Sequence, residues 1–233
     1  MDLIEALRST GAVREFTDEP VADEVVARIL GTARFAPSGG NAQSWHVVVV
    51  KDESTRRRLR DLYVPGWRDY LAMSVAGLRP WAPGNDPAVE AAAMAAIPAE
   101  IAATAAQGFA GEFDRVPVLL AVFADLTALA AVDRDFDRYP IAGGASVYPF
   151  VWSVLLAAHA EGLGGVMTTM LVREEPEVKR LLGAPEHWAL ATVVALGRPA
   201  HPRKRLRRRP VHSFTTVDRA DGPAFDTAQE GSP

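Results

Sequence analysis

The sequence contains no cysteine among its 233 residues. Without cysteine there is no disulfide, no thiolate nucleophile and no cysteine-ligated zinc or iron–sulfur centre. Any covalent chemistry must therefore come from another group.

An excess of basic residues and a long apolar run are also missing. The formal net charge of −4 argues against a general nucleic-acid or acidic-membrane binder, because an acidic surface repels both polyanions. The longest apolar stretch, near "PVLLAVFA", is shorter than the roughly 18 residues that a membrane span requires. The first residues, "MDLIEALRST", lack the basic and apolar regions of a signal peptide, so we expect a cytoplasmic protein with no membrane partner.

Several catalytic and metal-binding motifs are absent as well. The five histidines show no metal-type pairing, which predicts no metal site. No G-x-S-x-G motif marks a serine hydrolase, and "EGLGGV" is not the complete G-x-G-x-x-G of a Rossmann dinucleotide site.

What the chain does have is enough apolar residue content, 48%, to bury one large core. We expect a single domain over residues 1–219, followed by a small, polar C-terminal tail at 220–233. Apolar spacing predicts helices near residues 3–8 and 23–33 and an almost wholly apolar, buried helix at 148–161. Continuous β-branched runs predict strands buried on both faces at 45–50, 116–125 and 189–199, with a fourth strand entered through glycines at 162–171.

Residues 64–115 differ in composition from the rest of the chain. Prolines are followed by a long alanine-rich run, which predicts a helical excursion. The excursion is either a surface helical pair with a structural role only or a lid or partner-embracing arm over a pocket. Trp67, Tyr70 and Trp81 are candidate walls of such a pocket, although a role as core aromatics explains them equally well.

Three polar clusters are candidates for binding. The first contains Arg8, Ser9, Thr10 and Arg14, whose guanidinium and hydroxyl groups suit a phosphate; surface ion pairs with Glu5 or Glu15 are the alternative. The second is the loop of "RFAPSGGNAQSWHVVVV". Its Asn and Gln side chains offer both donors and acceptors, as the uracil-like edge of a flavin or a nucleotide base requires, and its glycines let the backbone approach a flat ring.

The third cluster is the basic run "HPRKRLRRRPVHSF". It is single and short and lacks interleaved aromatic residues, so a nucleic-acid patch is disfavoured. Two interpretations of this run remain: it binds one phosphate, or it is a solvated extended segment.

Taken together, these segments resemble the FMN-dependent nitroreductase family over most of the chain. The most specific element is "APSGGNAQSW", which is similar to the family's A-P-S-x-x-N-x-Q loop. "VREFTDEPV" resembles the family's R-x-F opening, and "AEGLGGVMTTM" and the late "LGRP" strand complete the pattern.

The resemblance implies an α+β fold, with a mixed or antiparallel sheet of four or five strands surrounded by helices. It also implies an intertwined homodimer with two FMN molecules at the subunit interface. A homodimer agrees with "YPFVWSVLLAAHAE", which is too apolar for the surface of an ordinary monomer.

Carried over by position, the resemblance also assigns the cofactor-binding residues. Arg14 faces the flavin N1/O2 edge, where a fixed positive charge stabilises the reduced flavin. The backbone N–H at Thr169, with Thr168 and Met170 beside it, addresses N5. Arg8, Thr10, Arg207 and Arg208 bind the phosphate, while Ser38, Gly39, Asn41 and Gln43 lie along the ring and ribityl chain.

The implied activity is that of an NAD(P)H oxidoreductase. NAD(P)H reduces FMN and leaves, and an electron-poor acceptor such as a nitroaromatic or quinone then takes its place. No side chain need act as a catalytic acid, because the cofactor carries the chemistry. Dehalogenation, enoate reduction, flavin fragmentation and non-catalytic flavin binding remain as alternatives.

Overall fold

A computed structural model describes residues 2–201 and 206–225 of the chain. Contacts divide the chain into two compact units, Met1–Arg203 and Lys204–Pro233, and each is described by itself. The second unit contains the short 3-10 helix η5 (Val211–Ser213) and a bridge between Thr216 and Ala224. The predicted domain boundary after residue 219 stays a prediction, and residues 226–233 of the predicted tail lie outside the described residues.

The first unit is built on a four-stranded sheet in the order β1-β2-β4-β3, and every neighbouring pair is antiparallel. This arrangement confirms the predicted α+β class. The strands are β1 (Trp45–Val50), β2 (Val118–Asp125), β3 (Gly164–Thr168) and β4 (Trp188–Gly197).

The central strand β2 is buried along seven of its eight residues. Since side chains alternate across a strand, Leu120 and Val122 enter one apolar cluster while Leu119 and Ala121 enter another. The sheet therefore has a core on each face, which is the burial that its continuous apolar runs predict.

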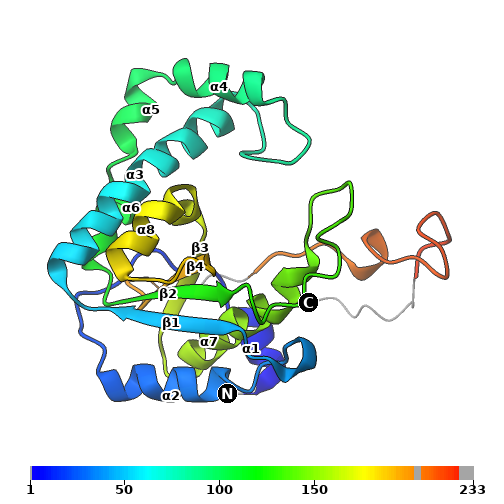
Figure 1. Cartoon of the computed structure of the whole chain (residues 1–233), viewed down its shortest axis with the longest axis horizontal. Helices are drawn as coiled ribbons and strands as arrows, with labels where there is room; N and C mark the ends of the chain where they lie inside the picture. Colours follow the sequence, from blue (N-terminus) through cyan, green and yellow to red (C-terminus); the bar gives the residue numbers. More distant parts are fainter. Residues whose placement is uncertain (1, 202–205, 226–233) are drawn as a thin grey trace. The chain divides into compact units, whose positions relative to one another are not determined.

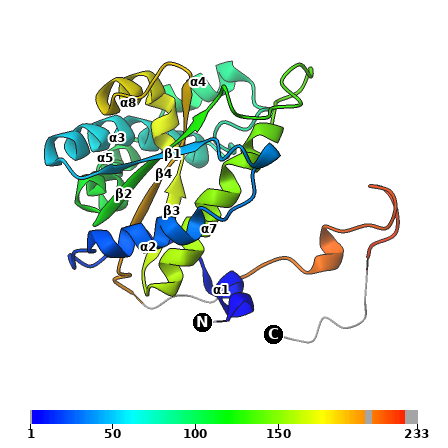
Figure 2. The ribbon, with the colours of Figure 1, turned by 60° about the horizontal axis from the view of Figure 1, so that its bottom comes forward.

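One core lies between one face of the sheet and the helices α2 (Asp23–Ala33) and α7 (Tyr148–Ala160), which pack against each other and the sheet. Figure 1 shows both helices below the strands, and Figure 2 shows α1 (Leu3–Ser9) at one end of α7. Phe150, Val151 and Val154 of α7 are buried, as the apolar pattern of this segment predicts.

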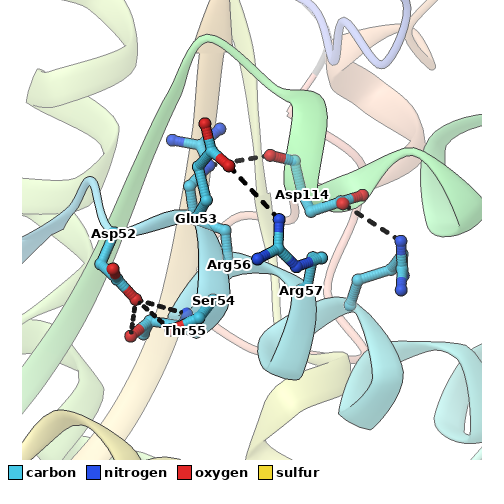
Figure 3. A network of polar contacts seen from close by, with 8 residues as sticks. Asp52, Glu53, Ser54, Thr55, Arg56, Arg57 and Asp114 are labelled. Atoms are coloured by element: carbon cyan, nitrogen blue, oxygen red, sulfur yellow. Dashed lines mark hydrogen bonds and ion pairs between the residues drawn. The ribbon is translucent and has the colours of Figure 1, made fainter.

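The other core lies between the opposite face of the sheet and the helices α3 (Glu53–Val75) and α8 (Glu175–Leu182). Asp52 caps α3 by accepting hydrogen bonds from the Thr55 N–H and from the Ser54 and Thr55 hydroxyls (Figure 3). Arg56, one turn later, donates to the carbonyl oxygens of Val50, Asp114 and Val116. These bonds fix the start of α3 to the ends of β1 and β2.

The predicted excursion at residues 64–115 is helical in the structure, and its first helix already begins at Glu53. The remaining elements of the first unit are α4 (Pro87–Ala95), α5 (Ala99–Thr104), α6 (Gly108–Gly111), η1 (Gly39–Asn41), η2 (Phe113–Arg115), η3 (Ala142–Ser146) and η4 (Met170–Glu174). Within the described residues, no helix combines the length and apolar character needed to cross a membrane.

Candidate functional site

The segment that carries Arg14 is held in an extended conformation against the sheet. The Val13 N–H donates to the Gly165 carbonyl over 2.9 Å, and the Thr17 N–H donates to the Arg198 carbonyl over 2.9 Å. Glycine is needed in β3 for this approach, because a β-carbon on Gly164 would lie 2.7 Å from the Val13 Cγ2. The glycines of β3 thus determine how closely the segment that carries Arg14 approaches the sheet.

The charge of Arg14 acts on the buried Tyr63 of α3. Burial raises the pKa of the Tyr63 hydroxyl, while its hydrogen bond with Thr168 and the positive charge of Arg14 act in the opposite direction. Across the described residues neither Arg8 nor Arg14 has an ion-pair partner, and Glu15 pairs with His201 instead. The surface ion pairs considered for the first cluster are therefore not formed.

Thr10 contributes a buried hydroxyl to the same region. Its side chain is almost fully buried, and its Oγ1 has no hydrogen-bond partner. The neighbouring Ser9 Oγ lies 3.2 Å from His159 Nε2, near the end of α7, whereas Arg8 is exposed. Because a buried hydroxyl without a partner costs free energy, Thr10 is a natural contact for a ligand.

Thr168 ends β3 and is held from two elements. Its Oγ1 lies 3.0 Å from the Tyr63 hydroxyl, and its carbonyl oxygen accepts a hydrogen bond of 2.9 Å from the Thr192 hydroxyl of β4. Thr169 follows with φ −106° and ψ 7°, the sparsely allowed bridge region, and is exposed. Met170 then begins η4, so the predicted strand at 162–171 is shorter at both ends.

The loop before β1 is tightly turned and strained. The Ser38 hydroxyl accepts from the Gln43 N–H over 2.9 Å, and the Gly39 N–H donates to the Ser146 Oγ over 3.0 Å. Asn41 and Gln43 have φ of 55° and 49°, a left-handed conformation that asparagine tolerates but that is costly for glutamine. Both side chains are exposed, while the Oγ of the adjacent Ser44 is buried without a partner.

The loop and the Thr10 segment contact opposite ends of α7. Ser146, which holds the loop, directly precedes this helix, whereas His159, which holds Ser9, lies in its last turn. A helix of 13 residues is about 20 Å long. Within one copy of the chain, the two predicted parts of the cofactor site are thus separated by most of that length.

The structure therefore brings the segment of Arg14 to β3, which ends at Thr168, and it anchors the segments of Thr10, Ser38 and Gly39 near the ends of α7. Arg207 and Arg208 belong to the second unit, so their role at the phosphate stays a prediction. Tyr63, Ser146 and Thr192 were not identified from the sequence, because only tertiary contacts distinguish them from ordinary helix, loop and strand residues. No group of three or more potential metal ligands occurs in the ranges that the structure describes.

Comparison with known proteins shows the family of this chain. The family model "Nitroreductase family" matches residues 7–198, which is most of the chain. The chain belongs to the nitroreductase family. Members of this family are oxidoreductases, and a solved structure of the same fold has FMN bound.

Individual relatives of this family member differ in activity. An NADH dehydrogenase from Thermus thermophilus is 31% identical over 84% of this chain and 87% of its own. A 5,6-dimethylbenzimidazole synthase from Rhodobacter capsulatus is 29% identical over 84% of this chain and 83% of its own. The structure of an iodotyrosine deiodinase bound to FMN and 3-iodo-L-tyrosine is 22% identical over 90% of this chain and 96% of its own, with a TM-score of 0.64.

The residues of this chain fit FMN. The unpartnered Thr10 and Ser44 hydroxyls lie in two of the segments predicted to contact the cofactor, as do the strained Asn41 and Gln43. Arg14 has no ion-pair partner among the described residues, so its charge is available to an anionic group. The phosphate, ribityl hydroxyls and ring edge of flavin mononucleotide match these side chains in chemical type.

Proposed function

We propose that this chain is an FMN-dependent NAD(P)H oxidoreductase that reduces an electron-poor acceptor such as a nitroaromatic or a quinone. The observation that carries the proposal is that the segment of Arg14 lies along β3, the strand that ends at Thr168. The Val13 N–H donates to the Gly165 carbonyl, so two predicted cofactor segments from distant parts of the sequence meet there. When bound, FMN would supply the chemistry of hydride transfer between the pyridine nucleotide and the acceptor.

The side chains of the protein bind the cofactor and tune it. Arg14 provides a permanent positive charge, which stabilises negative charge on the reduced ring and raises its reduction potential. Thr10 and Arg8 hold the phosphate with Arg207 and Arg208, while Ser38, Gly39, Asn41 and Gln43 address the ring and ribityl chain. The backbone N–H of Thr169, flanked by Thr168 and Met170, faces N5.

We further propose that two copies of the chain complete the site. Within one copy, the loop at residues 38–43 and Thr10 are held near opposite ends of the roughly 20 Å helix α7. A second copy would bring its own loop to the Arg14 side. Several large apolar side chains that are more than half exposed are available for such an interface: Leu3, Phe35, Val132, Tyr139 and Ile141.

The first experiment is the absorbance spectrum of the purified protein after FMN is added and excess is removed, with the mass measured by light scattering. We expect one flavin per chain and a dimeric mass. Anaerobic NADH and NADPH, added separately, then bleach the flavin, and 4-nitrobenzoate or menadione restores its colour. A colourless monomer would refute the proposal, and a flavin that neither nucleotide reduces would leave only a binding protein.

Arg14 provides the matched variants. Arg14→Gln should lower the reduction potential of bound flavin and slow its reduction about tenfold, with partial recovery in Arg14→Lys. Arg57→Gln, which removes an exposed arginine from α3, is the control. Equal potentials in all four proteins would exclude the assigned role of Arg14.

Dehalogenation and flavin fragmentation are kept as second candidates because relatives named for a deiodinase and a 5,6-dimethylbenzimidazole synthase cover most of the chain. The same reduced protein tests them. Iodide release from 3-iodo-L-tyrosine would favour the first, and loss of flavin with formation of 5,6-dimethylbenzimidazole in air would favour the second.

A further inference from the structure

Thr192 is a polar residue in the most buried part of the sheet. It is fully buried in β4, the other inner strand of the sheet, and its neighbours along the strand, Val193 and Val194, are apolar and buried. Its hydroxyl donates to the Thr168 carbonyl oxygen over 2.9 Å. A valine would fill nearly the same volume without a hydroxyl to satisfy, so packing alone gives no reason for threonine here.

Tyr63 holds the same residue from the other side. Its ring is 3% exposed, stacks on Phe113 at 4.5 Å and meets the edge of Phe109 at 5.9 Å. These contacts fix the ring, and therefore fix the position of the hydroxyl that lies 3.0 Å from Thr168 Oγ1. Both the side chain and the carbonyl group of Thr168 are thus anchored.

The anchored carbonyl determines the direction of the next N–H. The Thr168 carbonyl and the Thr169 N–H belong to one planar trans peptide group, in which they point in opposite directions. When Thr192 fixes the carbonyl oxygen, it also fixes the line along which the Thr169 N–H points. Thr169 needs such support, because it lies in the bridge region between the end of β3 and η4.

We propose that Thr192 and Tyr63 are positioning residues that aim the Thr169 N–H at the reacting edge of the flavin. This inference rests on the proposed function, which places that N–H at N5. Neither residue touches the cofactor: Thr192 acts through the Thr168 carbonyl and Tyr63 through the Thr168 hydroxyl. The strength and direction of one backbone donor thereby depend on two hydroxyls in the core.

The test compares Thr192→Val, Thr192→Ser and Tyr63→Phe with the unchanged protein. Thr192→Val keeps the shape but removes the donor, and Thr192→Ser restores it. Tyr148→Phe is the control, because its hydroxyl bonds to the carbonyl of Ala191, the neighbour of Thr192, and leaves Thr168 untouched. The readouts are amide hydrogen exchange at Thr169 without flavin, the FMN dissociation constant, the flavin reduction potential and the rate of reduction by NADH or NADPH.

We expect Thr192→Val to speed Thr169 exchange, to lower the reduction potential and to slow flavin reduction about tenfold. Tyr63→Phe should act in the same direction and more weakly, since it loosens the side chain but leaves the carbonyl bond. Thr192→Ser and Tyr148→Phe should stay within about twofold of the unchanged protein.

Two results would overturn the inference. Unchanged exchange at Thr169 in both Thr192→Val and Tyr63→Phe would show that the peptide needs neither hydroxyl. Faster exchange with an unchanged potential and reduction rate would show a structural role only. If Thr192→Val does not fold, Tyr63→Phe decides, with Tyr148→Phe as its control. Failure of the unchanged protein to take up FMN would instead refute the proposed function, and the exchange data would still judge the two anchors.

Discussion

Replacing Gly164 by alanine should disturb the cofactor site through packing alone. The added β-carbon would lie 2.7 Å from Val13 Cγ2, 3.0 Å from Val13 Cβ and 3.0 Å from Pro199 Cγ. Since Gly164 is buried, the strain cannot be relieved into solvent, and overpacking of this kind costs about 2 kcal/mol. The segment able to move is the one at residues 12–16, and it carries Arg14. We therefore expect the free energy of unfolding to fall by about 2 kcal/mol and FMN affinity to fall about tenfold.

Urea unfolding and FMN titration measure the two effects separately. Adding Val13→Ala removes one of the crowded carbons and should recover part of both losses. Gly31→Ala in α2 is the control, because its new β-carbon has no atom within 4 Å and should stabilise the helix by about 0.5–1 kcal/mol. The reasoning fails if Gly164→Ala equals the unchanged protein in stability and affinity, or if Val13→Ala makes it worse.

Three further changes probe the supports of the site and of the sheet. Ser146→Ala leaves the Gly39 N–H without its partner, so FMN should bind several-fold more weakly at a stability loss of about 1 kcal/mol, measured by titration and urea unfolding. Arg56→Met removes the side-chain donor from three carbonyl oxygens. The free energy of unfolding measured in urea should fall by about 3 kcal/mol, while FMN binding is retained. Hydrogen bonds from Ser54 and Thr55 lower the pKa of Asp52 to about 2. Ionised Asp52 stabilises the fold fully above the ordinary carboxyl pKa, and this stabilisation is lost as the pH falls through about 2. The difference in thermal midpoint between Asp52→Asn and the unchanged protein should therefore shrink as the pH falls over that interval. A constant difference between pH 2 and 7, measured by circular dichroism, would contradict this assignment.

The sheet was the most predictable part of the fold. β2 and β4 appear in the sequence as continuous apolar runs because both faces of these strands are buried, so no polar residue is needed on either side. β3 was predicted over 162–171 but ends at Thr168, because "TML" suits a strand and the 3-10 turn η4 equally well. Hydropathy does not separate a short buried strand from the turn that follows it.

Helix α3 shows where local signals were outweighed by tertiary contacts. The prolines suggested that a new segment begins near residue 64, yet the helix runs from Glu53 to Val75 through Pro65. On either side of this proline, Tyr63 and Gly66 are buried against Thr168 and Met170. Those contacts compensate for the missing backbone hydrogen bond, and a single sequence gives no sign of them.

The candidate site divides in the same way. Thr10, Arg14, Ser38, Gly39, Asn41 and Gln43 were predicted because their residue types and spacing resemble a family pattern, and their roles stay predictions. Thr192, Tyr63 and Ser146 were missed because threonine in a strand, tyrosine in a helix and serine before a helix are ordinary in isolation. Only their contacts in the folded chain, with Gly39 for Ser146 and with Thr168 for Tyr63 and Thr192, distinguish them.

The strain in the loop before β1 indicates that this segment is not arranged for stability alone. Gly40 adopts a φ of 60° without penalty, but Asn41 and Gln43 adopt nearly the same conformation with side chains attached. Glycine in place of Gln43 would remove a cost of about 1 kcal/mol, and both side chains are exposed, where packing does not require them. The Gln43 side-chain amide makes only a long hydrogen bond of 3.4 Å to Asn41, so contacts within the loop do not account for this strain. Under the proposed function, a flavin edge that presents alternating donors and acceptors is the partner of this amide, and its binding free energy would offset the strain.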